Sequence, residues 1–315
     1  MGVNMAITAA MVKELREMTG AGMMDCKKAL SETNGDMDEA VEYLRKNGQA
    51  KAEKKASRIA AEGLCTVVSK DEKTAAVVEV NSETDFVAKN ETFHEFVKAV
   101  ATQAVNSDAA DLDAFLAEAW NEDAGKTVND ALVEKVAVIG ENLKIRRFEK
   151  VVAENGCVAT YVHGGGRIAV IVDAETAVVN EAVKEALVNI AMQIAALSPK
   201  YVSRDEVSAD YIAHEKEILL AQIMNDPKES QKPEKVINGM IEGRISKELK
   251  EICLVDQVYV RAEDGKQTVA KYLEEVSKAA GTTVKVKRFV RFETGEGIEK
   301  KQEDFAAEVA AQMNA

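Results

Sequence analysis

The chain has few of the residues from which metal sites and disulfide frameworks are built. Its 315 residues include four cysteines and three histidines. The cysteines are far apart and form no Cys-x-x-Cys pair: Cys26, Cys65, Cys157 and Cys253. The histidines are equally dispersed, with no His-x-x-x-His or His-x-Glu spacing: His94, His163 and His214. We therefore expect reduced, mostly buried thiols, no metal site and no catalytic triad.

Long apolar runs and an excess of positive charge are also missing. No apolar run approaches the roughly 18 residues that cross a bilayer, and the first residues lack the pattern of a signal peptide. These absences predict a cytoplasmic protein without membrane contact. The formal net charge is −13, whereas a nucleic-acid backbone selects for clustered Lys and Arg, so no direct nucleic-acid contact is expected. One basic run, Lys51 to Arg58, favours a solvated helix or linker, with an RNA contact as the alternative.

A phosphate-binding loop is absent from the sequence as well. Gly164-Gly165-Gly166 lacks the Gly-Lys-Ser/Thr ending of such a loop and lies between two predicted strands, which favours a hairpin turn. His163 beside this turn is a lesser candidate for a partner contact, and a plain hairpin residue is the alternative. Without a nucleotide loop, a metal cluster or a nucleophile, the chain is predicted to be no enzyme, to need no cofactor and to act on another protein.

The chain does have apolar material for more than one domain, because 46% of its residues are hydrophobic and 30% are charged. Residues 8–46 contain three short helical patterns, broken at Gly20-Ala21-Gly22 and at Asn34-Gly35-Asp36. Three such helices resemble a compact bundle of the ubiquitin-associated type. Met23 and Met24 are candidates for an adaptable contact patch, and we expect one of them in the core. Ubiquitin binding is an alternative function that leaves the rest of the chain unexplained.

An internal repeat divides the middle of the chain. Gly140 to Phe148 recurs as Gly281 to Phe289, with the glycine, the apolar pair, the basic pair and the aromatic residue in register. Glu62-Gly63 and two short β-rich runs likewise match Asn155-Gly156 and two such runs. Each copy therefore predicts a β-hairpin, helices and a final strand, and the two copies predict related α+β subdomains with antiparallel sheets.

The second copy is longer than the first. Its extra residues carry helical patterns at 210–224 and 233–252, joined by Asn225-Asp226-Pro227. These patterns predict an antiparallel helical hairpin inserted at about 203–252. Such an arm does not bury its apolar stripe alone, and packing against a second copy to form a homodimer is one way to cover it.

The first copy carries an acid and a large aromatic residue where a strand passes into a helix. Residues 74–80 are rich in β-branched side chains, and apolar residues with helical spacing begin at Phe93. Asp85 and Phe86 therefore lie near a helix start. We call the four residues at this point the Asp-Phe turn: Thr84, Asp85, Phe86 and Val87.

Two interpretations of the Asp-Phe turn compete. In the first, Phe86 begins the core side of the helix and Asp85 belongs to its cap. In the second, both side chains are presented to a partner. The second copy favours presentation, because residues 173–180, aligned with residues 81–88, keep Glu-Thr but have Ala-Val in place of Asp-Phe. A core position tolerates that change, whereas a projecting acid and aromatic side chain would be lost by it.

The sequence therefore divides into four pieces, at residues 1–55, 56–150, 151–292 and 293–315. The last piece carries apolar residues at every fourth position, namely Phe305, Val309 and Met313. This spacing predicts a C-terminal helix with one narrow apolar stripe. The helix folds back on the core of the chain or docks in a groove of a partner.

Four segments together resemble the bacterial translation elongation factor Ts family. They are Val12 to Leu30, Thr84 to Ala88, Gly140-Glu141-Asn142 and Gly295 to Lys300. The first two are highly specific to the family, and the match spans essentially the whole chain. The resemblance implies a guanine nucleotide exchange factor for the GTPase elongation factor Tu, which itself supplies GDP and magnesium.

The resemblance also assigns roles to particular residues. Phe86, with Thr84 and Val87 around it, would insert near the magnesium and phosphate site of the partner, and Asp85 would perturb the surrounding polar contacts. The N-terminal helices would hold the GTPase domain, and the C-terminal helix with Phe305 and Val309 would add a second grip. The N-terminal contact residues are Arg16, Met23, Met24 and Lys27. The main alternative is a protein-binding scaffold without exchange activity.

Overall fold

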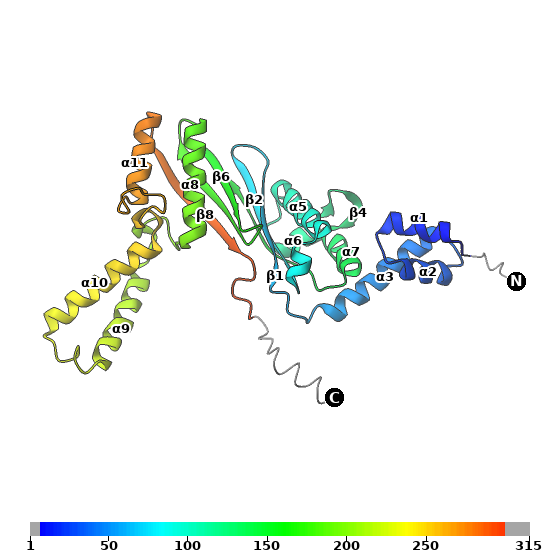
Figure 1. Ribbon diagram of the computed structural model, residues 1–315, viewed down its shortest axis with the longest axis horizontal. Coiled ribbons are helices and arrows are strands. Elements are labelled where there is room, and N and C mark those ends of the chain that lie inside the picture. Colours follow the sequence, from blue (N-terminus) through cyan, green and yellow to red (C-terminus); the bar gives the residue numbers. More distant parts are fainter. Residues whose placement is uncertain (1–6, 300–315) are drawn as a thin grey trace.

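The computed structural model describes residues 7–299 and arranges helices and antiparallel strands along one elongated body (Figure 1). Three helices lie at one end, two sheets lie in the middle and a helical hairpin projects at the other end. This architecture confirms the predicted α+β class. The predicted C-terminal helix lies outside the described residues.

The N-terminal end is formed by α1 (Ala9–Thr19), α2 (Met23–Glu32) and α3 (Met37–Lys55). The Thr8 hydroxyl caps α1 and the Asp36 carboxylate caps α3, so both helices begin at side chains that accept orphan backbone N–H groups. The buried residues that these helices share are Val12, Leu15, Cys26, Ala29, Leu30 and Ala40.

The last helix of this bundle is longer than its sequence pattern indicated. It continues to Lys55, and Gly48 in its second half is buried against Val133 and Ala137 of α7 (Val128–Ile139). Of the two predicted alternatives for this segment, a helix or a linker, residues 51–55 are helix, and α3 joins the bundle to the first sheet subdomain.

The basic run that includes the end of α3 makes contacts within the chain. Lys51 Nζ lies 2.9 Å from Asp25, Lys55 donates to the Gly140 carbonyl, and Arg58 lies 3.5 Å from Glu83. Lys51, Lys55 and Arg58 are therefore paired within the chain.

Two three-stranded antiparallel sheets form the middle of the molecule. The first contains β1 (Glu62–Ser69), β2 (Thr74–Ser82) and β5 (Lys144–Val152) in that order. The second contains β6 (Gly156–His163), β7 (Ile168–Thr176) and β8 (Val284–Glu293). The hairpin and final strand expected of each copy are therefore present.

The two sheets pack face to face, and helices cover their outer faces (Figure 1). On the central strands β2 and β7, alternate side chains point to opposite faces of the sheet. Val77 and Ile171 lie between the two sheets, whereas Val78 and Val172 face the helices. Because both faces are buried, these strands have continuous apolar runs rather than an alternating pattern.

The covering helices differ between the copies. The first sheet is covered by α5 (Glu91–Asn106), α6 (Leu112–Ala117) and α7, with a small ribbon of β3 (Ala119–Trp120) and β4 (Asp123–Thr127) between α6 and α7. The second sheet is covered by α8 (Glu181–Leu197) and α11 (Val269–Ala280).

The predicted hairpin is inserted between the two helices that cover the second sheet. It consists of α9 (Ala209–Asn225) and α10 (Glu234–Ile252), flanked by the 3₁₀ turns η1 (Arg204–Glu206) and η2 (Leu254–Asp256). The expectation that its apolar stripe is left uncovered is wrong. Its apolar residues pack against each other and against the base of the arm, so they form a small core of their own: Val207, Ile223, Ile237, Ile241, Ile245, Leu249 and Cys253.

One buried carboxylate links the first sheet to the end of the described chain. Glu79 on β2 is completely buried and accepts hydrogen bonds from Arg146 Nη1 at 2.9 Å, Arg147 Nε at 2.6 Å and the Gly295 N–H at 2.8 Å. A bulge in the pairing of β2 with β5 adds one residue to β5 here, so two consecutive arginines reach the same carboxylate. Burial alone would raise the pKa of Glu79, but these hydrogen bonds lower it below its ordinary value of 4.5.

The second sheet has a bulge at the matching place, with Asp173 where the first sheet has Glu79. Asp173 is also buried, but its nearest cation, Arg288 Nε, is 3.9 Å away. Burial therefore dominates and raises the pKa of Asp173 above its ordinary value of 3.8. Each copy therefore places a buried carboxylate at the bulge of its sheet, and the copies differ in how well nearby groups compensate its charge.

This difference predicts opposite outcomes for two matched variants. Glu79→Gln should lower the free energy of unfolding at pH 7 by on the order of 3 kcal/mol, because it leaves the arginines without their buried counter-charge. Asp173→Asn should leave that free energy unchanged or raise it, because the folded state stabilises the protonated form of Asp173. Denaturant unfolding at pH 7 measures both, and equal losses in the two variants would show that the two buried carboxylates are equally compensated, contrary to this prediction.

The same variants test the pH dependence. A carboxyl with a lowered folded pKa contributes stability above its unfolded pKa and loses it as the pH falls through the folded value. Below pH about 4.5 the parent protein should lose the stability contributed by Glu79. The free energy of unfolding should therefore fall less steeply with decreasing pH in Glu79→Gln than in the parent.

Candidate functional site

The Asp-Phe turn is a single turn of helix at the end of β2. This helix, α4 (Asp85–Ala88), begins at Thr84, whose hydroxyl accepts from the Val87 N–H. Phe86 is 81% exposed, whereas Val87 packs against the first core and Ala88 is buried. The interpretation of Phe86 as a core residue is therefore wrong, and its ring projects from the surface.

The acid of the turn has a local partner. Asp85 is exposed, and its carboxylate lies 2.6 Å from Lys89 Nζ, one turn further along the chain. The hydrogen bond from Lys89 lowers the pKa of Asp85 below its ordinary value of 3.8. An exposed pair of this kind contributes little to stability, so Asp85 remains available to exchange Lys89 for another partner.

The second copy lacks this turn altogether. Strand pairing sets Gly63 opposite Asn81 and Gly156 opposite Glu175, so Asn81 corresponds to Glu175 and the predicted alignment of this segment was displaced by two residues. Residues 83–89 connect β2 to the cap of α5, whereas residues 177–179 connect β7 to the cap of α8. The four-residue α4 is thus an insertion in the first copy, which is a larger difference than the predicted replacement of Asp-Phe by Ala-Val.

A carboxylate from a distant segment holds the base of the turn. Glu141, which follows the C-cap Gly140 of α7, accepts from the N–H groups of Glu83 and Thr84, both at 3.1 Å. It also accepts from the Thr84 hydroxyl at 2.7 Å. In return, Glu83 accepts from the Asn142 N–H at 2.5 Å. In the sequence Glu141 stands within the Gly-Glu-Asn motif, and no neighbouring residue indicates this contact with residues 83–84.

The N-terminal candidates form a separate exposed surface. Arg16, Met23, Met24 and Lys27 are all exposed on α1 and α2. The expectation that one methionine lies in the core is wrong, because Met23 is 59% and Met24 is 75% exposed. Cys26, Ala29 and Leu30 bury the inner face of α2 in their place, and two adjacent methionines remain available for a contact.

The remaining candidates lie elsewhere. His163 is exposed at the end of β6, with its Nδ1 2.9 Å from the Tyr161 hydroxyl. The glycines beside it form the predicted hairpin turn, and the Gly166 carbonyl accepts from the Cys65 N–H at 2.6 Å, which joins the turn to the first sheet. Phe305 and Val309 lie outside the described residues. The candidates are therefore spread along the molecule rather than gathered at one centre.

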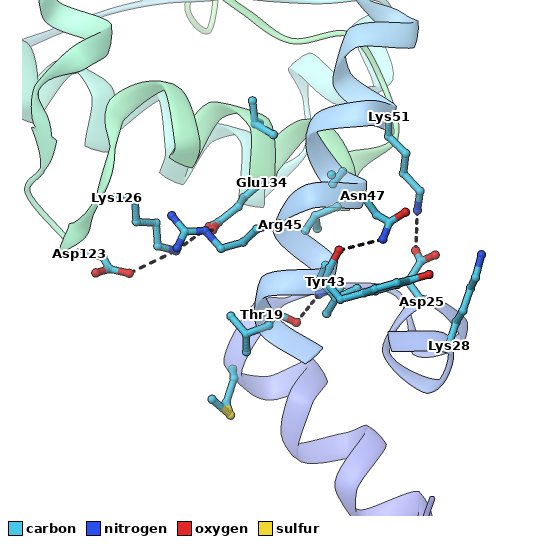
Figure 2. Close-up of a pocket in the computed structure, with 18 residues that line it drawn as sticks. Thr19, Asp25, Lys28, Tyr43, Arg45, Asn47, Lys51, Asp123, Lys126 and Glu134 are labelled. Atoms are coloured by element: carbon cyan, nitrogen blue, oxygen red, sulfur yellow. Dashed lines mark hydrogen bonds and ion pairs between the residues drawn. The ribbon is translucent and has the colours of Figure 1, made fainter. Parts of the chain in front are cut away.

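A cavity of about 260 Å³ lies between the N-terminal helices and α7 (Figure 2). Its apolar walls include Tyr43 and Val138, and its rim carries ion pairs such as Lys51 with Asp25 at 2.9 Å. Another rim pair joins Lys126 to Glu134 at 2.6 Å. The labelled cations at the rim are mostly paired within the chain, so the cavity offers little free charge to an ionic ligand (Figure 2).

Within residues 7–299, no group of three His, Cys, Asp or Glu side chains is arranged to hold a metal ion. No helix in that range is both long enough and apolar enough to cross a membrane. All four cysteines are free and buried, as predicted, and burial raises the pKa of the Cys65 thiol to about 12.

Comparison with known proteins places this geometry in a family. The family model described as "Elongation factor TS" matches residues 83–296, a range that begins at the base of the Asp-Phe turn and includes β5 and the whole second sheet. The chain belongs to the elongation factor Ts family. The predicted resemblance to this family is thereby confirmed.

Relatives in this family match the chain over nearly its full length. Elongation factor Ts of Clostridioides difficile (strain 630) is 53% identical over 98% of this chain and 99% of its own length. The elongation factors Ts of Clostridium tetani and Clostridium novyi are 51% and 50% identical, with the same coverage of both chains. Family membership therefore extends to the N-terminal helices that the family model does not include.

The exposure of Phe86 predicts a stability result. Phe86→Ala should change the free energy of unfolding by no more than about 0.5 kcal/mol, because an exposed side chain has no packing to lose. The matched control is Phe93→Ala on α5, which removes a fully buried ring and should cost about 3 to 5 kcal/mol. Thermal and denaturant unfolding compare the two variants, and similar losses would mean that Phe86 packs in solution.

Proposed function

We propose that the chain is a guanine nucleotide exchange factor that binds elongation factor Tu and promotes release of its GDP. The observation that carries the proposal is the exposed Phe86 on an inserted, externally held turn, in a chain of the elongation factor Ts family. When an exposed aromatic side chain on a well-positioned turn enters a partner pocket, its apolar surface is removed from water, and this favours binding. The proposed pocket lies near the magnesium and phosphate site of the GTPase.

The physical basis is reciprocal coupling. A protein that binds the nucleotide-free GTPase more tightly than the GDP-bound form must weaken GDP binding by the same factor. No bond is made or broken, so this chain needs no cofactor and is not an enzyme in the chemical sense. Typical couplings are about 1 to 3 kcal/mol, and a shift of a GTPase from almost fully GDP-bound to almost fully free needs about 5.5 kcal/mol. Several contacts must therefore contribute.

We assign these contacts to four surfaces. The Asp-Phe turn perturbs the nucleotide site, with Phe86 as the inserted side chain and Asp85 exchanging Lys89 for a polar group of the partner. Arg16, Met23, Met24 and Lys27 hold the GTPase domain, and His163 adds a contact on the opposite sheet. The C-terminal residues Phe305 and Val309 supply a further grip in this proposal. The whole interaction takes place in the cytoplasm.

Release of a fluorescent GDP from elongation factor Tu tests the proposal directly. The parent chain should accelerate release in stopped-flow measurements, and Phe86→Ala should reduce the acceleration by about thirtyfold, the equivalent of about 2 kcal/mol. Val260→Ala is the matched control, because Val260 is an exposed apolar residue in a turn of the second copy. Val260→Ala should accelerate GDP release from elongation factor Tu as strongly as the parent chain does.

The alternative function makes a different prediction in the same experiment. A protein-binding scaffold would bind elongation factor Tu without changing the rate of GDP release. Binding without acceleration by the parent chain would therefore replace exchange with the scaffold function. A Phe86→Ala variant that is as active as the parent would remove the Asp-Phe turn from the mechanism.

We also propose that the helical hairpin pairs with the hairpin of a second copy. Its stripe of isoleucines is buried within the arm, but Leu220 and Met224, one turn apart on α9, remain 43% and 54% exposed. Ile218 and Val236 add exposed apolar surface to the same arm. Such residues are the apolar surface that a second arm would cover.

This pairing predicts a change in oligomeric state. Leu220→Asp combined with Met224→Asp should convert a dimer to a monomer in light scattering, because two buried charges would then face each other without partners. Gln222→Asp, at an exposed polar position of α9, is the control and should remain dimeric. GDP release should stay near the parental rate in both variants. A monomeric parent protein would contradict the proposal.

A further inference from the structure

The function proposed above assigns no partner contact to Glu141, yet both oxygens of its carboxylate accept hydrogen bonds. Oε2 accepts from the N–H groups of Glu83 and Thr84, and Oε1 accepts from the Thr84 hydroxyl. These donors belong to the two residues immediately before α4, although Thr84 lies 57 residues from Glu141 in the chain. These hydrogen bonds of Glu141 thus all hold the base of the Asp-Phe turn.

A second set of hydrogen bonds completes this connection from the opposite direction. The Glu83 carboxylate accepts from the Asn142 N–H at 2.5 Å, and the buried Asn142 side chain donates to the Arg58 carbonyl at 2.8 Å. Three segments that are distant in the chain are tied together at this point. We call the contacts between residues 83–84 and residues 141–142 the clamp.

The backbone places Glu141 at the clamp. Helix α7 ends at Gly140, which has a left-handed φ of 86°, a conformation that glycine adopts without steric cost. The chain therefore turns sharply after the helix and carries Glu141 towards β2. Lys55 at the end of α3 donates to the Gly140 carbonyl and braces the same corner.

The turn needs external support. Helix α4 has only four residues, and an isolated helix of one turn is not stable in water because its nucleation is costly. Phe86 makes no core contact that would fix its direction, since it is 81% exposed. The direction of the ring is therefore set by the backbone at residues 83–88, and the clamp holds the first two of these residues.

The second copy provides an internal comparison. Thr282 occupies the place of Glu141, after Gly281, which caps α11 in the same left-handed conformation as Gly140. That copy also lacks the inserted turn. The carboxylate and the turn thus occur together in one copy and are missing together from the other, although they are far apart in sequence.

We infer that Glu141 is a positioning residue for nucleotide exchange, which holds the Asp-Phe turn in its partner-binding geometry before the partner arrives. This inference rests on the proposed exchange function. Preorganisation lowers the ordering cost of binding, and a small displacement of an inserted side chain is enough to reduce its effect. Glu141 acts through Phe86 rather than on the partner itself.

A double-mutant cycle on GDP release from elongation factor Tu tests this dependence. Glu141→Ala should slow the catalysed release by about tenfold in the parent background. It should change the rate by less than about twofold in the Phe86→Ala background, because the displaced side chain is then already missing. Equal effects in both backgrounds, or no effect in the parent background, would overturn the inference.

Two further variants separate positioning from general stability. Glu118→Ala is the control, because Glu118 also accepts two side-chain hydrogen bonds in the first copy, from Gln103 at 3.0 Å and Ser107 at 2.7 Å. It should lower the melting temperature without changing the exchange rate of the folded protein. Thr84→Val removes the hydroxyl that donates to Glu141 and should slow the catalysed release as Glu141→Ala does.

Amide hydrogen exchange gives a readout that does not involve the partner. The N–H groups of Ala88 and Lys89 close α4 on the Thr84 and Asp85 carbonyls, and Glu141→Ala should lower their protection at least tenfold while Glu118→Ala leaves it unchanged. Unchanged protection in Glu141→Ala would overturn the inference even if the parent chain is active. If protection falls but the parent chain does not accelerate GDP release, the exchange function fails while the clamp itself stands.

Discussion

The buried carboxylate of Glu79 is the interaction on which the arrangement of the sheets depends. It lies on the face of β2 that also carries Val77, towards the second sheet, and it receives two arginines from the bulge of β5. A lone charge in this position would cost several kcal/mol, and the arginines together with the Gly295 N–H compensate it. Arg147 also stacks over Phe292 of β8, with 4.2 Å between the guanidinium carbon and the ring centre. One buried charge thus joins both sheets and the loop that leads to the C-terminal segment.

A packed frame of this kind explains why two similar copies can carry different surface segments. The sheets, their bulges and the capping glycines recur, so the copies share a scaffold. The differences lie in the connections: one copy has an inserted turn, and the other has an inserted hairpin. Loops carried on a packed scaffold can change without loss of the core, which is where binding surfaces commonly arise.

The elongated shape suits the proposed mechanism, which relies on several contacts with one partner. Helix α3 runs without interruption from the N-terminal bundle to the first sheet, and Gly48 allows it to pack closely on α7. The bundle surface with Met23 and Met24 is therefore held at a defined distance from the Asp-Phe turn. Under the proposed function, binding energy gained at the bundle would help to place Phe86, since the intervening chain has little freedom to absorb it.

The sequence by itself determined the local elements and their relationships. Capping residues and turn glycines predicted the N-terminal helices, the repeat predicted two sheets, and the strand-to-helix transition placed Asp85 at a helix start. These features depend on neighbouring residues, whose conformational preferences act locally. Family membership was also evident from contiguous segments, above all residues 12–30 and 84–88.

Only the tertiary structure decided which of these side chains are covered. Periodicity shows that a residue is apolar on one face, but it does not show what packs against that face. For this reason Phe86 could be predicted only as core or exposed, one methionine was wrongly placed in the core, and the hairpin stripe was wrongly left uncovered. The insertion of α4 was recognised only when strand pairing aligned the copies, and the contact of Glu141 with Thr84 leaves no local signal because its partners are far apart in the chain. Such contacts are determined by the packing of the whole molecule rather than by the residues beside them.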